Sequence, residues 1–459
     1  MTDQTAAPAP LAAIILAAGK GTRMKSDLHK VLHPLAGRPM LMHLLDSLST
    51  AGVARQVVIV GASGEQVEAA VQDRGVAIAW QQEQLGTAHA ALQARDALAD
   101  FDGIAIVCFG DTPLLAAATV ARLAARLQAA DAPAVAVLGF RPADPAAYGR
   151  VIAAADGTME RIVEYKDASP EERAVTLCNS GVTAVRTADL WRLLAAVGND
   201  NAAGEYYLPD VVGLAIAEGR RAVVIETGAD EVAGINSRAE LAGVEAAWQA
   251  ARRIRAMAEG ATLIAPETVW FAHDTVIGRD VTIEPHVFFG PGVRVADGAT
   301  IHGFSHIEGA EVGPGAEVGP YARLRPGAVL GAKSKVGNFV EIKKATLGEG
   351  AKANHLTYLG DAEIGAGSNI GAGTITCNYD GFFKYRTVIG AGAFIGSNSA
   401  LVAPVTIGDG AIVGAGSVVT SDVEADALAL VRAERQTKPG WAARFRERAK
   451  ALKVRKAAR

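Results

Sequence analysis

The second half of the chain repeats an apolar residue every six positions, and this period constrains the fold more than any other feature of the sequence. Neither an α-helix, with a period of 3.6, nor a single strand, with a period of two, produces it. A hexapeptide solenoid does, because each six-residue unit forms one flat face and three faces close a coil of about 18 residues. The three runs, with a five-residue step between the first and second, are Ile277, Ile283, Phe289, Val295, Ile301 and Ile307; Val312, Val318, Leu324, Leu330, Val336 and Ile342; and Ile389, Ile395, Leu401, Ile407, Val413 and Val419. We therefore predict a parallel β-helix over residues 261–431.

Two stretches interrupt the period, roughly residues 344–361 and 376–386. We expect loops that leave the solenoid there, because such insertions often carry function. His355 is the one histidine of nine inside an interruption, and Arg325, Lys343, Lys344 and Lys384 lie near it in the sequence. An imidazole titrates in the range needed to take a proton from an amine, and the cations suit a phosphate group. From the residues alone, a purely structural histidine remains the alternative.

The first half alternates apolar, strand-like segments with helical periods, which predicts a parallel sheet covered by helices. Residues 12–18, 56–61, 103–109 and 134–140 are the expected strands. Glycine marks the change of character, since 27 of the 50 glycines lie between Gly278 and Gly416. We divide the chain into an α/β domain over 1–236, a linking helix over 237–260, the solenoid over 261–431 and a basic tail over 432–459.

The linking helix is predicted from its start signal and its periodicity. Ser237 and Glu240 have capping-box spacing. Leu241, Val244 and Trp248 follow at helical spacing, and Gly260 supplies a stop.

A glycine-rich loop follows the first expected strand, in the sequence Leu16-Ala17-Ala18-Gly19-Lys20-Gly21-Thr22-Arg23-Met24. Glycines let the backbone approach phosphates, and Arg23 and Lys30 add positive charge. The spacing fits neither the Walker A loop nor the dinucleotide fingerprint. An ordinary strand–helix turn with two surface cations is the alternative.

Asp111 stands at the carboxyl end of another apolar strand, where open α/β sheets bind ligands. A carboxylate there suits Mg²⁺ bridging nucleotide phosphates. The alternative is a helix N-cap, because the following Thr-Pro also fits a helix start.

Several further motifs occur in one order with these: Gln-Gln-Glu-Gln-Leu-Gly-Thr over residues 81–87, Gly-Asp-Thr-Pro-Leu over 110–114, Tyr148-Gly149-Arg150, Ile162-Val163-Glu164, Asn179-Ser180-Gly181 and Gly234-Ile235-Asn236. Together with the solenoid they closely resemble the bacterial bifunctional N-acetylglucosamine-1-phosphate uridylyltransferase/glucosamine-1-phosphate acetyltransferases, over roughly residues 11–437. The resemblance implies a Rossmann-like nucleotidyltransferase domain followed by a left-handed β-helix. One position departs, since the family usually has proline where this chain has His29, which questions the rigidity of the loop that carries Lys30.

Carried over position by position, the resemblance implies a UTP site, a sugar site and a Mg²⁺ site in the first domain. UMP would pass from UTP to N-acetylglucosamine 1-phosphate with release of pyrophosphate. The nucleotide loop would be Leu16, Ala17, Ala18 and Gly19, with Arg23 and Lys30 on the triphosphate, Gln81, Gly86 and Thr87 on the uracil, Gly149, Glu164 and Asn179 on the sugar, and Asp111 and Asn236 on Mg²⁺.

The same resemblance implies that the solenoid acetylates glucosamine 1-phosphate with acetyl-CoA, so that both reactions together make UDP-N-acetylglucosamine for peptidoglycan and lipopolysaccharide. His355 would be the general base, and a backbone N–H is the default expectation for the oxyanion. The sugar phosphate would be bound by Arg325, Lys343, Tyr358, Asn369 and Lys384, and acetyl-CoA by Ala372, Asn378, Tyr379, Ser397, Ala415 and Arg432. The family implies a homotrimer with acetyltransferase sites between subunits. Alternatives are a single-activity sugar-1-phosphate nucleotidyltransferase whose solenoid only drives assembly, and a non-catalytic scaffold.

The composition of the chain limits the compartment and the binding partners that we expect. No apolar run reaches the roughly 18 residues of a membrane helix, the first residues lack the charge pattern of a secretory signal, and three cysteines do not make a disulfide framework. We therefore expect a cytoplasmic protein. The tail carries eleven Lys or Arg against two Glu, about +9, and the rest of the chain about −13. We interpret the tail as a solvated terminus rather than a binding site for nucleic acid or anionic lipid, with its start near Arg432 contributing to the CoA phosphates.

Overall fold

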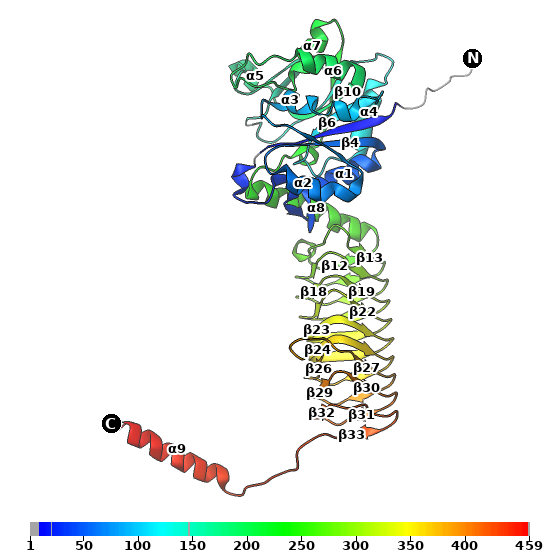
Figure 1. Ribbon diagram of the computed structural model, residues 1–459, viewed down its shortest axis with the longest axis vertical. Helices are drawn as coiled ribbons and strands as arrows, with labels where there is room; N and C mark the ends of the chain where they lie inside the picture. The colour runs from blue at the N-terminus through cyan, green and yellow to red at the C-terminus, as the bar shows by residue number, and fades with distance from the viewer. Residues whose placement is uncertain (1–8, 20, 146, 458–459) are drawn as a thin grey trace, which may run out of the picture. The chain divides into compact units, whose positions relative to one another are not determined.

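The computed structural model describes residues 9–19, 21–145 and 147–457, which form two compact units (Figure 1). The first unit ends at Arg255 and also includes Phe271–His273. The second takes Ala256–Trp270 and the chain from Asp274 onward.

The first unit is built on a nine-stranded mixed sheet. Its main path runs β11-β7-β10-β6-β1-β4-β5, with β8 (Arg150–Ala153) and β9 (Met159–Val163) as a hairpin beside β10. The path strands are β1 (Leu11–Ala17), β4 (Val53–Val60), β5 (Ala77–Trp80), β6 (Ile104–Phe109), β7 (Val135–Phe140), β10 (Cys178–Arg186) and β11 (Ala222–Thr227). Strands β6, β1, β4 and β5 are parallel, whereas β10 is antiparallel to both of its main neighbours.

Both faces of this sheet are buried, which is why its strands are continuous apolar runs rather than alternating ones. Ala13 and Ile15 of β1 pack with α1 (Met40–Thr50) and α4 (Ala117–Leu127). Ile14 and Leu16 pack on the other face with α3 (Thr87–Leu92), α6 (Thr187–Ala196) and α7 (Asp210–Ala217). Two further short helices, α2 (Gly64–Val71) and α5 (Pro170–Arg173), also belong to the unit.

Helix α8 (Arg238–Ala258) confirms the predicted helix and the Ser237 half of the predicted capping box, while the Glu240 half bonds to the residue before Ser237. The Glu240 amide donates to Ser237 Oγ at 3.2 Å, while the Glu240 carboxylate accepts from the Asn236 amide at 2.5 Å. Val244 and Trp248 pack against Leu35 and Met40, so most of this helix belongs to the first unit rather than bridging two bodies.

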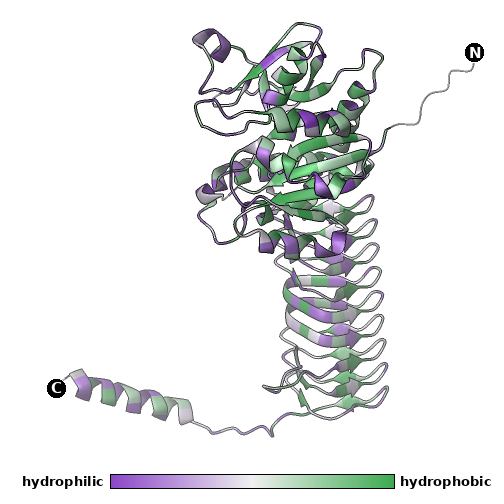
Figure 2. Cartoon of the chain, turned by 45° about the horizontal axis from the view of Figure 1, so that its top comes forward, coloured by the Kyte–Doolittle hydropathy of each residue, from purple (hydrophilic) through white to green (hydrophobic). Residues whose placement is uncertain are grey.

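The second unit is a parallel β-helix of 22 strands, from β12 (Thr262–Leu263) to β33 (Leu428–Ala429). Strands pair mostly with the third strand along, as β13 (Val276–Ile277) does with β16 (Arg294–Val295), so three faces make one coil. Of the eighteen residues predicted to point inward, all but Ile277 are buried. Figure 2 shows the hydrophobic strand residues repeating from coil to coil.

The first predicted interruption is wrong. Residues 344–361 do not leave the solenoid, because β23 (Lys335–Leu347) and β24 (Lys352–Ile364) are long strands that pair in register from one coil to the next. Five-residue steps from Ile342 to Leu347 and from Leu359 to Ile364 keep the buried positions in line. The interruption is an artefact of counting strictly by six, and His355 lies on a strand of a regular coil.

The second interruption is confirmed as a loop. Between β26 (Ile375–Cys377) and β27 (Thr387–Ile389) the chain makes a detour. Ile364 pairs with Leu347 in the coil before it and with Ile389 in the coil after it, so the coil that ends at Ile389 is the longer of the two. We call residues 378–386 the detour loop.

The tail forms helix α9 (Trp441–Ala457), whose described side chains are exposed. Among the residues that the structure describes, no helix combines the length and apolar character needed to span a bilayer. The three cysteines are free, and Cys108 and Cys178 are buried.

Candidate active sites

The carboxyl ends of β1 and β6 meet at one edge of the sheet and carry the first candidate site. A cavity of about 500 Å³ opens there. Ten of the predicted site residues line it, drawn from five separate segments: Leu16, Ala17, Ala18, Gly19, Lys30, Gln81, Gly86, Thr87, Asp111 and Asn236. The glycine-rich loop is therefore part of a cavity and not an isolated turn.

The Lys30 side chain bonds to both predicted metal ligands in this cavity. Its Nζ donates to Asp111 Oδ2 at 2.5 Å and to Asn236 Oδ1 at 3.1 Å. The Lys30 and Asp111 side chains are only 14% and 13% exposed. Helix α4 does not begin until Ala117, so Asp111 is not a helix cap. Asp111 and Asn236 thus direct oxygen atoms at one cation position.

These two oxygen ligands fit Mg²⁺, which binds proteins through one or two carboxylates and completes its shell with water and substrate phosphates. Within the described part of the chain, no group of three or more His, Cys, Asp or Glu residues could hold a metal ion by itself. The site therefore fits a metal that arrives with a phosphate ligand better than a permanently bound one.

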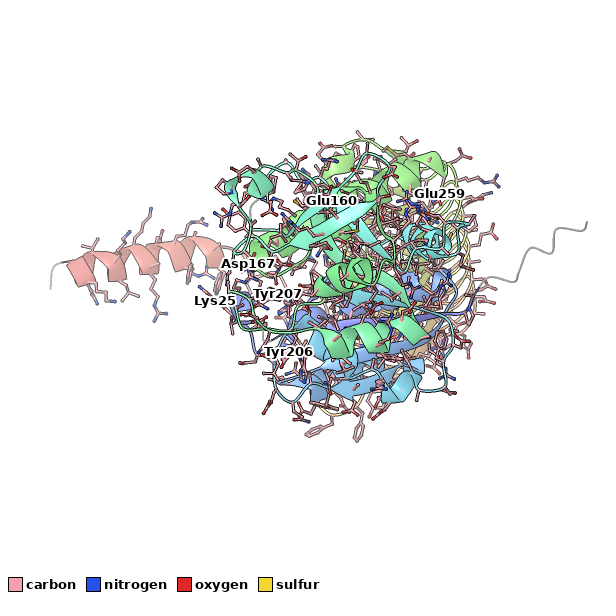
Figure 3. All side chains as sticks on the ribbon, turned by 90° about the horizontal axis from the view of Figure 1, so that it is seen from above. Lys25, Glu160, Asp167, Tyr206, Tyr207 and Glu259 are labelled. Carbon is pink, nitrogen blue, oxygen red and sulfur yellow. The ribbon has the colours of Figure 1, made fainter. Side chains whose placement is uncertain are left out.

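Gly86 shapes the part of the cavity predicted to read the base. Its φ of +119° is a glycine conformation, and an added Cβ would lie 2.5 Å from the backbone oxygen of Tyr206, a residue labelled in Figure 3. Gln81 is buried and donates through Nε2 to the Gly86 carbonyl and to His89 Nδ1, both at 3.0 Å. Thr87 opens α3 and accepts from the Leu208 amide at 2.9 Å. These bonds hold the turn rigidly around the cavity.

A second, smaller cavity of about 210 Å³ adjoins the first. It brings together Gly149, Glu164 and Asn179, the three residues predicted to hold the sugar, and both cavities share Thr87 and Tyr148. An added Cβ on Gly149 would lie 3.1 Å from Glu164 Oε1, so the glycine leaves room for the carboxylate. Burial raises the pKa of Glu164, and the neighbouring Asp167 and Asp210 raise it further.

One predicted residue does not join this site. Arg23 is exposed on the turn Thr22–Met24 and does not line the cavity. Lys20 of the same motif lies outside the described residues.

The departure at His29 does not leave the Lys30 segment unrestrained. The backbone of His29 has φ -55 and ψ 137 in degrees. Proline would adopt the same φ, so the histidine keeps the backbone path that the family residue would give. Its amide, which proline lacks, donates to Gln66 Oε1 at 2.9 Å, and Gln66 Nε2 donates to the Asp27 carbonyl at 3.0 Å.

The second candidate site lies along one edge of the solenoid. Successive coils place His355, Ala372, Ser397 and Ala415 above one another, as the registers of the strands just before them show. The Gly373 amide donates to the His355 carbonyl, the Asn398 amide to the Ala372 carbonyl and the Gly416 amide to the Ser397 carbonyl. At about 4.8 Å per coil, His355 and Ala415 are about 14 Å apart. We call these four residues the axial column.

Arg432 lies beyond the end of the axial column. Its Cδ is 3.8 Å from the position that a Cβ on Gly416 would take. His355 itself is exposed at the other end of the column. A long, thin ligand with an anionic end could therefore run from the imidazole to the guanidinium.

Cations gather on a neighbouring part of the same coils. Lys384, from the detour loop, lowers the pKa of Lys343 through a direct side-chain contact, and Arg325 lowers it further. The Arg325 guanidinium is also paired with Glu341 at 2.7 Å. Two lysines held this close repel one another, and a phosphate between them would relieve the repulsion.

Of the remaining predicted residues, Asn378 and Tyr379 belong to the detour loop and Tyr358 and Asn369 lie on the strands before it. Asn378 is buried and donates to Asp361 Oδ2 at 2.5 Å, and an added Cβ on Gly360 would strike both Asn378 and the Tyr358 hydroxyl. Tyr379 is 60% exposed and Asn369 lies half-buried on β25 (Asn369–Ile370). Asp380 holds the loop by accepting from the Phe382 and Phe383 amides at 2.7 and 2.6 Å.

Sequence reasoning missed several residues of these sites. Gln84 lines the first cavity and donates to the Ala18 carbonyl at 2.5 Å, and Glu205 lines the same cavity. Asn338 contacts His355 from the preceding coil. Gln84 lies inside the quoted 81–87 motif, and Asn338 could have been found only by knowing that this coil is one residue short of three full hexapeptides.

The fold and the sites define a class: a nucleotidyltransferase-type α/β unit followed by a hexapeptide-repeat transferase. Comparisons with known protein families agree with both assignments, the nucleotidyltransferase-type unit and the hexapeptide-repeat unit. Residues 13–175 match the family described as "MobA-like NTP transferase domain", and residues 386–421 match "Bacterial transferase hexapeptide (six repeats)".

Relatives match along the whole chain. A protein of Rhizorhabdus wittichii, named "Bifunctional protein GlmU", is 67% identical over 459 residues, covering 100% of both chains. Proteins of the same name from Sphingopyxis alaskensis and Novosphingobium aromaticivorans are 63% and 65% identical, covering 98% and 97% of this chain and 98% and 99% of the relatives. The chain belongs to the family of bifunctional GlmU proteins. It is a bifunctional enzyme, a uridylyltransferase and glucosamine-1-phosphate acetyltransferase, and the single-activity and scaffold alternatives are not favoured.

Proposed function

We propose that the residues predicted from the sequence carry the two reactions as the geometry arranges them, the uridylyl transfer in the paired cavities and the acetyl transfer along the axial column. The observation that carries the first assignment is the convergence of Lys30, Asp111 and Asn236 in the larger cavity, which shares Thr87 and Tyr148 with the smaller one. A nucleotide in the large cavity and a sugar phosphate in the small one would meet there.

In the uridylyl transfer, a phosphate oxygen of N-acetylglucosamine 1-phosphate attacks the α-phosphorus of UTP in line, and pyrophosphate leaves. Such a transfer depends on positioning and charge neutralisation rather than on a nucleophilic side chain. Lys30 stabilises the phosphates from inside the cavity, and Arg23 acts only where the triphosphate extends past Gly19. Mg²⁺ held by Asp111 and Asn236 would neutralise phosphate charge.

The residues that line the two cavities would recognise the uracil and the N-acetyl sugar. Gln81, Gly86 and Thr87 form a rigid edge for the uracil, as the bond from Gln81 to the Gly86 carbonyl and the bond from the Leu208 amide to Thr87 support. Gly149, Glu164 and Asn179 hold the N-acetyl sugar, and the half-buried carboxylate of Glu164 can accept from sugar hydroxyls.

In the acetyl transfer, His355 takes a proton from the glucosamine ammonium, and the freed amine attacks the thioester carbon of acetyl-CoA. The C–S bond then breaks, and one of the two protons left on the attacking nitrogen passes to the CoA sulfur, which leaves as the thiol. Arg325, Lys343 and Lys384 hold the phosphate of glucosamine 1-phosphate, with Tyr358 and Asn369 on the sugar. The pantetheine arm lies along Ala372, Ser397 and Ala415, where small side chains leave room, and Arg432 meets the CoA phosphates. Asn378 and Tyr379 cover the arm from the detour loop.

We include a homotrimer with acetyltransferase sites between subunits in this proposal. The support is an aromatic ladder on the same corner as the axial column, in which successive rings stack at centroid distances of 4.8, 5.0 and 5.3 Å: His286, Phe304, Tyr321 and Phe339. Phe304 and Phe339 are 53% and 56% exposed, and Leu356 beside His355 is 63% exposed. Apolar surface of this kind is normally covered by another protein surface.

Two substitutions test the assignments. Asp111→Ala should abolish most uridylyl transfer and leave acetyl transfer unchanged, because uncovered phosphate charge costs several kcal/mol in the transition state. His355→Ala should lower the acetyl-transfer kcat about 10²–10⁴-fold and leave uridylyl transfer unchanged. Each variant serves as the folding control of the other, since both activities are measured on the same preparation. Near-normal activity at the altered site would overturn that assignment.

A cytoplasmic location, and a tail that binds neither nucleic acid nor lipid beyond the contribution of Arg432, stay predictions.

A further inference from the structure

Asn338 and His355 occupy the same corner position in successive coils. They are direct partners in the register of β23 and β24. Asn338 Oδ1 lies 2.7 Å from His355 Nδ1. This separation is that of a normal hydrogen bond. Asn338 therefore extends the axial column by one coil on the side away from the small residues Ala372, Ser397 and Ala415.

The polarity of this bond decides which nitrogen can act. An amide oxygen only accepts hydrogen bonds, so Nδ1 must carry the proton. A neutral imidazole has one N–H, and the lone pair is then left on Nε2. A base needs that lone pair directed at the substrate, and Nε2 is the ring nitrogen turned away from the Asn338 contact.

The backbone holds both partners in place. The two strands are paired on both sides of this position, from Lys335 and Lys352 to Leu347 and Ile364. The His355 carbonyl also accepts from Thr357 Oγ at 2.7 Å. The imidazole itself is exposed, so the asparagine supplies the restraint on ring orientation that burial would otherwise give.

We propose that Asn338 is a positioning residue for the acetyl transfer: its side-chain carbonyl fixes the Nδ1–H tautomer and the orientation of the His355 ring, so that Nε2 receives the proton from the glucosamine ammonium. This inference rests on the proposed role of His355 as the base. Asn338 touches neither reacting atom in this mechanism, and its effect passes entirely through the imidazole.

The test combines a kcat and KM measurement with a double-mutant cycle on the full-length enzyme at mildly alkaline pH. Asn338→Ala should lower the acetyl-transfer kcat by about 10–100-fold, the usual effect of losing the partner that orients a functional imidazole. The KM for both substrates should change little, because no substrate contact is removed. Asn338→Asp, which keeps an acceptor at the same place, should restore most of the lost kcat.

The cycle separates positioning from a structural effect. In the His355→Ala background, Asn338→Ala should cause no further loss, because there is no ring left to orient. An equal loss in both backgrounds, a loss confined to KM, or a failure of Asn338→Asp to restore kcat would overturn the proposal. If His355→Ala alone leaves kcat unchanged, the base assignment fails instead, and the two failures are thereby distinguished. Uridylyl transfer, measured on each variant, reports that the chain is folded.

Discussion

Lys30 occupies the position where Asp111 and Asn236 direct their oxygens, so its ammonium is an internal cation that a divalent metal bound to the same oxygens would have to displace. The contacts are 2.5 Å to Asp111 and 3.1 Å to Asn236. We therefore expect the metal to bind weakly to the free enzyme and tightly only when a triphosphate draws Lys30 away. Lys30→Met, which removes the charge and nearly keeps the length of the side chain, should release this competition.

The size of the effect follows from the geometry. Two unit charges at the Lys30–Asp111 separation of 2.5 Å interact by about 1.7 kcal/mol in water-like surroundings and by more where water is partly excluded. A charge-assisted hydrogen bond is worth about 1.5–3 kcal/mol net. Each step of about 1.4 kcal/mol is tenfold in affinity, so Lys30→Met should bind Mn²⁺ about 10- to 100-fold more tightly than the wild type in the absence of nucleotide.

Electron paramagnetic resonance of free Mn²⁺ during titration measures this affinity without any turnover. Arg23→Met is the matched control, because it removes one positive charge from the same loop but lies on an exposed turn outside the cavity, and it should change Mn²⁺ affinity far less. Asp111→Asn in the Lys30→Met background should abolish the gain. Equal Mn²⁺ affinities for the wild type and Lys30→Met, or an equal gain from Arg23→Met, would refute the competition.

Four further outcomes are expected. Gly86→Ala should impair UTP binding and lower the melting temperature, because φ is +119° and the new Cβ would strike Tyr206, whereas Gly75→Ala, also at positive φ but in open space, should leave UTP binding intact. Asp380→Ala should raise the KM for acetyl-CoA several-fold without a change in melting temperature, since the detour loop loses three hydrogen bonds; an unchanged KM would argue against that loop as a cover for CoA. Burial lowers the folded-state pKa of His33, so the unfolded chain binds more protons than the folded chain below about pH 6.5. The melting temperature of the first unit should therefore fall as the pH drops below that value. The fall should be smaller in His33→Gln. A fragment ending at residue 250 should transfer UMP but melt below one ending at 273, because Gln249 exchanges two hydrogen bonds with Phe271 in the full chain; equal melting temperatures would contradict this.

The architecture of both units could be predicted because it depends on local patterns. Continuous apolar runs mark strands buried on both faces, and β1, β4, β6 and β7 begin and end within three residues of the predicted segments. The inward residues of the solenoid repeat at a fixed interval, so a run can be followed along the chain without knowledge of its partners. Motif spacing likewise placed Asp111 at a strand end, where the sheet itself brings it near the glycine-rich loop.

The predictions that were wrong or missing concern contacts between residues that are far apart in the sequence. A coil can close one residue short of three full hexapeptides, and a rule of strict sixes then mistakes a five-residue step for a loop, as at residues 344–361. Asn338 and His355 meet only because their coil is shortened in this way. Lys30 contacts Asn236, which is 206 positions away in the sequence, and no local pattern in either segment predicts this contact.

The detour loop shows why the axial column can serve as a binding surface at all. The loop lengthens one coil, yet Ile370 still pairs with Ile395, and Ile395 with Val413 beyond it. The insertion is therefore confined to a corner, and Ala372, Ser397 and Ala415 remain in line above His355. Because coil spacing is set by backbone hydrogen bonds and not by loop length, the loop can vary in sequence without altering the distance from His355 to Arg432. If the proposed assignments hold, substitutions in the loop should change the KM for acetyl-CoA, whereas a residue inserted into β24 or β25 should displace His355 from the column and remove the acetyl transfer itself.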